Sequence, residues 1–357
     1  MDEQREERPE LSTRPAEQLL IDALKGHAPQ RVLCTSLGRG QFAAAAARLF
    51  PTAKVACHFF DLYRAELARQ HWATESANGE ESLPQIVCSP DFPAEEFDLA
   101  ALPTSAQGEA ELTRELLQTA HQRLTLGGVL LVSTDNSRDR WLHEELQKIF
   151  PTVRRQDFSA GTVYVASKEA PLKRVRNFTA EFAFRDAERL LHVVSRPGVF
   201  SHRRVDPGAR QLLNAMEVHP GERVLDIGCG SGVVALAAAV RQKEVQVVAL
   251  DSQARAIECT AKGAELNSLN NITVEHSATG LTSGAETFDR VVANPPYYAG
   301  FRIARFFVET SRTALRKGGW LYVVTKQPDW YEENLPPLFA EVQIDPSKDY
   351  WIVRARR

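Results

Sequence analysis

The sequence contains only five cysteines in 357 residues, and none of them forms a CxxC pair or a Cys/His spacing typical of zinc. We therefore expect reduced thiols and no metal site. Long apolar runs are also missing, since no stretch approaches the roughly 20 residues of a membrane-spanning helix. Residues 1–17 lack the apolar core of a signal peptide. These absences predict a cytoplasmic protein without a membrane-spanning segment.

A strong net charge is absent as well. The net charge is −3, so no overall positive field indicates a nucleic-acid-binding protein, although a local basic face would be sufficient for one. The sequence does contain 43% hydrophobic and 25% charged residues, which is typical of globular proteins with adequate cores. Its length allows two ordinary domains rather than one.

The two halves of the chain repeat one pattern at a nearly constant separation. Three pairs of short segments match at shifts of 191 or 192 residues, namely Arg31–Cys34 with Arg223–Asp226, Phe97-Asp98 with Phe288-Asp289, and Gly127-Gly128 with Gly318-Gly319. An apolar strand pattern follows each glycine pair. The repeat indicates a duplicated α/β domain.

Strand and helix patterns alternate in the second half, which predicts a mostly parallel sheet. Strands are expected at 222–227, 245–250, 271–275, 288–293 and 320–325, helices at 232–241, 253–267 and 301–316, and a closing hairpin at 341–344 and 350–355. Another hairpin, 178–184 with 190–194, is expected between the halves. We expect a disordered tail at residues 1–20, a first domain at 21–170 and a second domain at 171–357.

The first half keeps the strand pattern but lacks the polar groups of the second. Its segment Ser36–Gly40 (SLGRG) stands where the second half has Gly228–Gly232 (GCGSG), and Cys34 stands where the second half has Asp226. We therefore expect a degenerate first domain without catalysis, used for support or for binding.

The stretch Asp226–Gly232 (DIGCGSG) joins a strand to an Ala-rich helix. Its glycines, Gly228, Gly230 and Gly232, would let the backbone approach a ligand closely. A dinucleotide-binding loop would need glycine at position 233, which is valine here. A carboxylate at position 226 would suit the cationic aminoacyl end of S-adenosylmethionine better than a pyrophosphate. The pattern predicts a site for S-adenosylmethionine.

Asp251 ends the next predicted strand. An acidic residue at that strand end can accept hydrogen bonds from both ribose hydroxyls of a nucleoside. An aspartate after a strand is also a common N-cap of the following helix. The upstream glycines favour the ribose role.

The segment Asn294-Pro295-Pro296-Tyr297 follows another apolar strand. It offers an amide oxygen, a carbonyl held rigid by prolines and an aromatic ring, which suit a planar substrate with an exocyclic amine. We predict that Asn294 and the Pro295 carbonyl accept hydrogen bonds from the amine, and that Tyr297 stacks on a flipped base. Together with the glycine motif, this indicates an amino-group methyltransferase.

Arg203 and Arg204 lie within a few residues of the expected pocket entrance. Such a pair would neutralise phosphates of a nucleic acid, so we count both residues as substrate-binding candidates.

The second half resembles the class I methyltransferases of the small-domain family, in particular the ribosomal RNA guanine-N2 methyltransferases. Residues 191–201 (LHVVSRPGVFS) resemble the segment by which that family enters its catalytic domain, and Asp206, Gly208 and Ala209-Arg210 continue it. The resemblance covers nearly the whole chain after residue 20. It implies an α/β protein of two tandem Rossmann-like class I methyltransferase domains, the first degenerate.

From this resemblance we expect transfer of a methyl group from S-adenosylmethionine to N2 of a guanine in ribosomal RNA, naked or in an assembling subunit. Phe200 and Asp206 are implied to close over cofactor or base, so Phe200 is counted with the cofactor residues and Tyr298 with the substrate residues. The family often has Phe where Tyr297 stands, and Tyr there is also usual in adenine-N6 and glutamine-N5 methyltransferases, which remain alternatives. A non-catalytic RNA-binding or assembly protein is a third reading.

Overall fold

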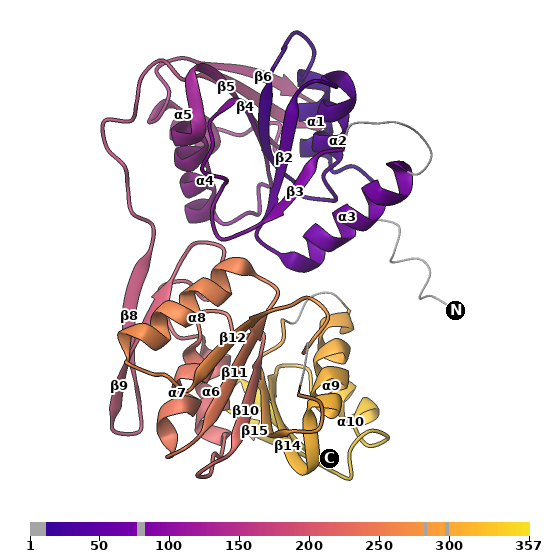
Figure 1. Ribbon diagram of the computed structural model, residues 1–357, viewed down its shortest axis with the longest axis vertical. Coiled ribbons are helices and arrows are strands. Elements are labelled where there is room, and N and C mark those ends of the chain that lie inside the picture. The colour runs from indigo at the N-terminus through magenta and orange to yellow at the C-terminus, as the bar shows by residue number, and fades with distance from the viewer. Residues whose placement is uncertain (1–11, 77–82, 282–283, 297–299) are drawn as a thin grey trace. The chain divides into compact units, whose positions relative to one another are not determined.

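The computed structural model describes residues 12–76, 83–281, 284–296 and 300–357. The chain divides into two compact units, one ending at Phe178 and the other beginning at Thr179 (Figure 1). The division falls later than the boundary expected after residue 170. One reason is that Gln118 exchanges two hydrogen bonds of 2.8 Å with the backbone of Arg176, which ties the segment after residue 170 to the first unit.

The first unit is a sheet with helices packed on it. Its elements are α1 (Pro15–Ala23), β1 (Arg31–Thr35), α2 (Gln41–Leu49), β2 (Lys54–Phe59), α3 (Leu62–Ser76), β3 (Gln85–Cys88), β4 (Phe97–Thr104), α4 (Ala110–Arg123), β5 (Leu124–Thr134), α5 (Trp141–Gln147), β6 (Val153–Phe158) and β7 (Gly161–Ser167). The strands lie in the order β3-β2-β1-β4-β5-β7-β6. β7 runs antiparallel to β5 and β6, and the other pairs are parallel.

Helix α1 corrects the expected tail. A disordered tail is expected at residues 1–20, but α1 begins at Pro15. Proline at the first helical position costs little, since that N–H has no partner within the helix. The helix buries Leu19 and Leu20 completely or nearly so. A helix therefore occupies part of the segment that was expected to be a disordered tail.

The second unit repeats the plan of the first and adds a hairpin. Its elements are β8 (Ala180–Asp186), β9 (Arg189–Ser195), α6 (Pro207–Ala215), β10 (Arg223–Ile227), α7 (Val233–Arg241), β11 (Gln246–Asp251), α8 (Ala254–Leu266), β12 (Ile272–His276), β13 (Phe288–Ala293), α9 (Arg302–Ala314), β14 (Leu315–Thr325), α10 (Asp329–Asn334), β15 (Glu341–Ser347) and β16 (Tyr350–Arg356). The main sheet has the order β12-β11-β10-β13-β14-β16-β15, and β8 pairs with β9 separately. The predicted strands, helices and hairpins are confirmed, with β14 beginning earlier than expected. Helices α6 and α10 are additions to the prediction.

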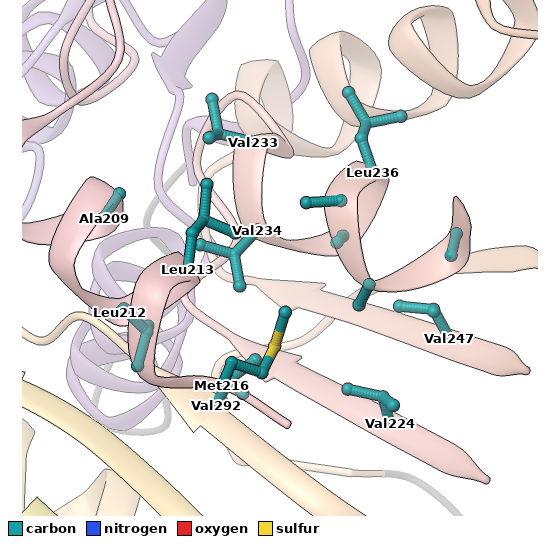
Figure 2. Close-up of a cluster of buried hydrophobic side chains, with 14 of the residues drawn as sticks. Ala209, Leu212, Leu213, Met216, Val224, Val233, Val234, Leu236, Val247 and Val292 are labelled. Carbon is teal, nitrogen blue, oxygen red and sulfur yellow. The ribbon is translucent and has the colours of Figure 1, made fainter. Parts of the chain in front are cut away.

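The core of the second unit lies on both faces of its sheet, because side chains of a strand alternate between faces. Figure 2 shows one of these clusters, in which Val224, Val247 and Val292 from β10, β11 and β13 lie with Leu213 of α6 and Val234 of α7. Helix α9 packs in a separate cluster with the alternate strand residues. Every helix in the described part of the chain is too short or too polar to span a bilayer.

Arg241, the last residue of α7, joins the hairpin to this core. It donates hydrogen bonds of 2.8 Å to both carboxylate oxygens of Asp186 at the end of β8. It also donates to the carbonyls of Leu213 and Met216 at the end of α6, each over 2.6 Å. These bonds give hydrogen-bond partners to the last carbonyls of α6 and to the buried carboxylate of Asp186. They therefore hold α6 in place beside α7.

Candidate active site

The carboxyl ends of neighbouring parallel strands form the site. Ile227 of β10 lies opposite both Leu250 of β11 and Ala293 of β13. The residues that follow these partners, Asp251 and Asn294, therefore emerge at the same edge of the sheet, where ligands of α/β proteins bind. A pocket open to solvent lies at this edge.

The glycine turn between β10 and α7 requires glycine for two different reasons. Gly228, Gly230 and Gly232 have φ angles of 74°, 56° and 81°, in the left-handed region that disfavours other residues. A Cβ atom on Gly232 would lie 2.9 Å from Thr260 Oγ1, whereas one on Gly230 would meet nothing within 4 Å. Gly232 therefore allows close packing inside the protein, and Gly230 leaves open space on the pocket side.

Asp226 precedes this turn and holds a buried carboxylate. Its Oδ2 has no hydrogen-bond partner among the described residues, although the residue is only 3% exposed. Burial raises its pKa to about 7; a hydrogen bond from the Ala235 backbone N–H opposes the rise, and the charge of Asp251 adds to it. An ammonium group would satisfy this oxygen and neutralise the buried charge. The carboxylate thus fits the aminoacyl end of the predicted cofactor.

Asp251 closes β11 and fixes the turn. Its Oδ2 accepts a hydrogen bond from Gly230 N–H over 2.9 Å, and its Oδ1 accepts one from Gln253 N–H over 2.9 Å. Gln253, rather than Asp251, is the N-cap of α8, because its side chain accepts from Arg255 and Ala256 N–H. The N-cap alternative for Asp251 is therefore wrong, and its half-buried carboxylate stands beside the turn.

Asn294 follows β13 and is held by a residue from another part of the unit. Its Nδ2 donates a hydrogen bond of 2.9 Å to Asp206 Oδ2. The same oxygen accepts a hydrogen bond of 2.8 Å from Ala209 N–H, which makes Asp206 the N-cap of α6. Both Asp206 and Asn294 line the pocket.

The loop between β9 and α6 forms one side of the pocket and is anchored to α8. Arg255 Nη1 donates to the Pro197 carbonyl and Gln253 Nε2 to the Gly198 carbonyl, each over 2.7 Å. Beyond these anchors, Phe200 lines the pocket with 63% of its surface exposed. A large apolar side chain held exposed at a pocket is suited to contact a planar ligand.

The structure brings six of the ten predicted site residues that it describes to this one pocket. Its lining comprises Phe200, Ser201, Arg204, Asp206, Ala209, Asp226, Gly228, Cys229, Gly230, Ser231, Val233, Val234 and Asn294. Arg203 is exposed in the same loop, and Pro295 is buried directly after Asn294, but neither is part of the lining. Gly232 and Asp251 support the turn without lining the pocket. Tyr297 and Tyr298 lie outside the described residues, so their predicted roles stay predictions.

Sequence patterns alone leave some pocket residues unassigned. Cys229 and Ser231 occupy the variable positions of the glycine motif, which carry no signal of their own. Asp206 was singled out only by resemblance, yet it is followed by Pro207, and aspartate before proline is a typical helix start. That signal would have predicted α6 and placed Asp206 at its N-terminus.

The corresponding turn of the first unit is closed by an internal carboxylate. Gly40 has φ 80°, close to the 81° of Gly232, so the two turns share a backbone conformation at the helix start. In the first unit, however, Glu17 of α1 accepts hydrogen bonds from the Ser36 hydroxyl and from Phe42 N–H, over 2.9 and 3.0 Å. Glu17 is fully buried. A group of the protein itself thus satisfies the donors of this turn.

Comparison with known proteins identifies the family of the second unit. A family model described as "Methyltransferase small domain" matches residues 190–354, which include every residue of the pocket. YbxB, an uncharacterized protein of Bacillus subtilis, is 30% identical over 189 residues, which are 51% of this chain and 94% of that protein. The chain belongs to the methyltransferase small domain family.

Other known proteins match more of the chain. A ribosomal RNA small subunit methyltransferase C of Shewanella sediminis is 28% identical over 256 residues, which are 69% of this chain and 73% of that protein. A solved structure from T. thermophilus, a 16S rRNA N2 G1207 methyltransferase (RsmC) in complex with AdoMet and guanosine, has a TM-score of 0.79. It is 22% identical and covers 96% of this chain and 92% of that chain, so it shows that the fold is shared.

Proposed function

We propose that this protein transfers a methyl group from S-adenosylmethionine to the exocyclic N2 of a guanine in ribosomal RNA. The observation that carries the proposal is the placement of Asn294 in one pocket with Asp226 and the glycine turn. An amide that can accept hydrogen bonds from an amine thus lines the same pocket as a buried carboxylate whose Oδ2 has no partner among the described residues. Relatives named as ribosomal RNA methyltransferases support the assignment of the substrate.

The cofactor side of the pocket is suited to a cationic nucleoside. The Asp226 carboxylate would bind the ammonium group, Gly230 leaves room for close approach, and Asp251 would accept hydrogen bonds from ribose hydroxyls. When bound, S-adenosylmethionine supplies an electrophilic methyl group on a sulfonium. The contribution of the protein is to hold that methyl group in line with the attacking amine.

The substrate side of the pocket would have to activate a weak nucleophile, the exocyclic amine of guanine. The lone pair of a guanine amine is delocalised into the ring, so it attacks poorly. The Asn294 oxygen and the Pro295 carbonyl would accept hydrogen bonds from its two N–H groups, which favours a pyramidal nitrogen. These bonds strengthen as positive charge develops on the nitrogen, so they stabilise the transition state more than the ground state.

The same pair of acceptors would serve an adenine-N6 or a glutamine-N5 amine, so the geometry alone does not select guanine. Two observations favour RNA over a protein substrate. Arg204 lines the pocket and Arg203 is exposed in the same loop, so both could contact phosphates of a flipped nucleotide. Phe200, also exposed there, offers a face for stacking on a base. We place the enzyme in the cytoplasm, where it would meet ribosomal RNA, naked or within an assembling subunit.

Product analysis tests this function. The purified protein is incubated with tritiated S-adenosylmethionine and with ribosomal RNA from cells that lack the protein, and the labelled RNA is digested to nucleosides. We expect the label in N2-methylguanosine. Label in N6-methyladenosine, or in a release factor supplied in a parallel reaction, would reject guanine as the substrate.

Asn294→Ala is the variant that links the product to the pocket. We expect it to abolish methyl transfer while the cofactor affinity in calorimetry stays near that of the wild type, because the pocket's cofactor side is unchanged. Turnover retained in this variant would remove Asn294 from the mechanism. Failure of the wild-type protein to bind S-adenosylmethionine would favour the non-catalytic reading.

A further inference from the structure

The contact between Asn294 and Asp206 decides which end of the Asn294 side chain is the acceptor. The two residues are 88 positions apart in the sequence, and Asn294 Nδ2 donates to Asp206 Oδ2 over 2.9 Å. An ionised carboxylate has acceptors only, so it can bind the amide nitrogen but repels the amide oxygen. Rotating the Asn294 carboxamide by half a turn would break this charge-assisted hydrogen bond and place the Asn294 oxygen against the Asp206 carboxylate, so that two acceptors would face each other. Asp206 therefore holds the carboxamide in one of its two orientations.

Asp206 itself is held firmly. Its Oδ2 also accepts from Ala209 N–H over 2.8 Å, and the two hydrogen bonds together fix the carboxylate between α6 and Asn294. Helix α6 is anchored by Leu212 and Leu213 in the core, both about 1% exposed or less. Figure 2 shows both leucines in the cluster between α6 and the sheet. The packing of α6 against the core therefore fixes the position of Asp206 at the start of that helix.

Gly208 preserves the space that this pair needs. A Cβ atom at this position would lie 2.8 Å from Asp206 Oδ2 and 3.4 Å from Asn294 Oδ1. Glycine is otherwise unfavourable within a helix, so its presence in the first turn of α6 is consistent with a steric requirement at Asp206 Oδ2 and at Tyr350 Cε1, which would lie 3.1 Å from that Cβ atom, whereas 3.4 Å from Asn294 is an ordinary contact. Among the described residues, no group donates a hydrogen bond to Asn294 Oδ1, so this oxygen is available to a substrate amine.

We propose that Asp206 is a positioning residue for methyl transfer: it binds the Asn294 nitrogen so that the Asn294 oxygen is kept as the acceptor for the substrate amine. This inference rests on the proposed function, because it assigns Asn294 the role of an amine acceptor. Asp206 contacts neither the amine nor the methyl group in this role. Its effect on the rate passes through the orientation of Asn294.

Three substitutions of Asp206 distinguish its effect on the orientation of Asn294 from its effect as the N-cap of α6. Asp206→Ser keeps an N-cap oxygen for Ala209 N–H but is too short to reach Asn294, whereas Asp206→Asn can keep both contacts through its oxygen. Asp206→Ala loses both. We expect Asp206→Ser to melt close to the wild type and Asp206→Ala to melt roughly 2–4 °C lower.

The activities should follow a different order from the melting temperatures. We expect kcat to fall roughly ten- to hundredfold in Asp206→Ser and in Asp206→Ala, and to stay within about threefold of wild type in Asp206→Asn. The dissociation constant of S-adenosylmethionine should not change in Asp206→Ser.

Several outcomes would overturn the proposal. Wild-type kcat in Asp206→Ser would do so, as would a loss of activity that follows the melting temperature. A wild-type protein that makes no N2-methylguanosine would reject the proposed function instead. The orientation of Asn294 can then still be measured from its side-chain amide NMR signals in protein labelled with 15N-asparagine, identified by their absence in Asn294→Ala. We expect these signals to shift in Asp206→Ser and to stay near their wild-type positions in Asp206→Asn; unchanged signals in Asp206→Ser would reject positioning.

Discussion

Gly230 N–H donates a hydrogen bond of 2.9 Å to Asp251 Oδ2, which ties the glycine turn after β10 to the carboxyl end of β11. One carboxylate therefore shapes the turn, and we propose that it also accepts hydrogen bonds from the ribose of the cofactor.

We expect Asp251→Ala to weaken S-adenosylmethionine binding at least about tenfold, because hydrogen bonds to a charged acceptor contribute roughly 1.5–3 kcal/mol each. Asp251→Asn should lie between Asp251→Ala and the wild type, since its oxygen can still accept from Gly230. Asp345→Ala is the matched control, because Asp345 forms an exposed ion pair with Arg354 outside the pocket. Titration calorimetry of the three variants checks the order, and an unchanged affinity in Asp251→Ala would remove Asp251 from the cofactor site.

The raised pKa of Asp226 predicts a pH-dependent affinity for the cofactor. Burial raises this pKa to about 7, so the carboxyl is mostly protonated and neutral at pH 6 and charged at pH 8. Only the charged form attracts an ammonium group, so affinity should rise by up to about tenfold per pH unit between pH 5.5 and 7 and then level off. Asp226→Asn should bind weakly with little pH dependence. A wild-type affinity that is flat across this range would contradict the assignment.

The raised pKa of Asp226 also predicts that the stability of the cofactor-free protein changes with pH in the direction opposite to the cofactor affinity. Because the folded state binds the proton more tightly than the unfolded chain, the free energy of unfolding should fall as pH rises from about 4 to about 7. Asp226→Asn removes the buried charge, so it should melt at a higher temperature than the wild type at pH 8 while binding the cofactor less tightly. The difference in melting temperature should shrink at pH 5.

The strand ends that carry Asp226, Asp251 and Asn294 are predictable from sequence because buried parallel strands appear as short apolar runs followed by polar residues. The hydrogen bond between Asp206 and Asn294 is not, since it joins positions 88 residues apart and depends on how α6 packs. The N-terminal segment shows another limit of local patterns. Charges and Pro15 indicate a tail there, whereas Leu19 and Leu20 bury one side of a helix against the first sheet.

Two glycines of the turn should separate stability from binding. Gly230→Ala places its methyl group in open space, so the protein should fold with a loss of roughly 1 kcal/mol from its positive φ while cofactor affinity falls markedly. Gly232→Ala brings its methyl group to within 2.9 Å of Thr260, so it should mainly lower the free energy of unfolding. Urea unfolding and calorimetry measure the two effects. If both variants lost cofactor affinity and stability to the same extent, the proposed difference between the roles of Gly230 and Gly232 would be wrong.

The buried Glu17 predicts that the first unit does not bind cofactor. Its carboxylate already accepts hydrogen bonds from Ser36 and Phe42, and Cys34 replaces the carboxylate that Asp226 supplies in the second unit. The wild-type chain should therefore bind one equivalent of S-adenosylmethionine.

Glu17→Ala should destabilise the first unit by roughly 1–3 kcal/mol for each donor left without a partner, and it should leave the stoichiometry at one, because the turn would still lack an acidic ligand for the ammonium group. Asp22→Ala is the control, since Asp22 is exposed on the same helix and, within the described residues, its side chain accepts a hydrogen bond from Gln18 Nε2. Urea unfolding followed separately for the two units measures the stability, and calorimetry measures the stoichiometry. A second equivalent bound by Glu17→Ala would mean that the first unit retains a cofactor site that its own helix occupies.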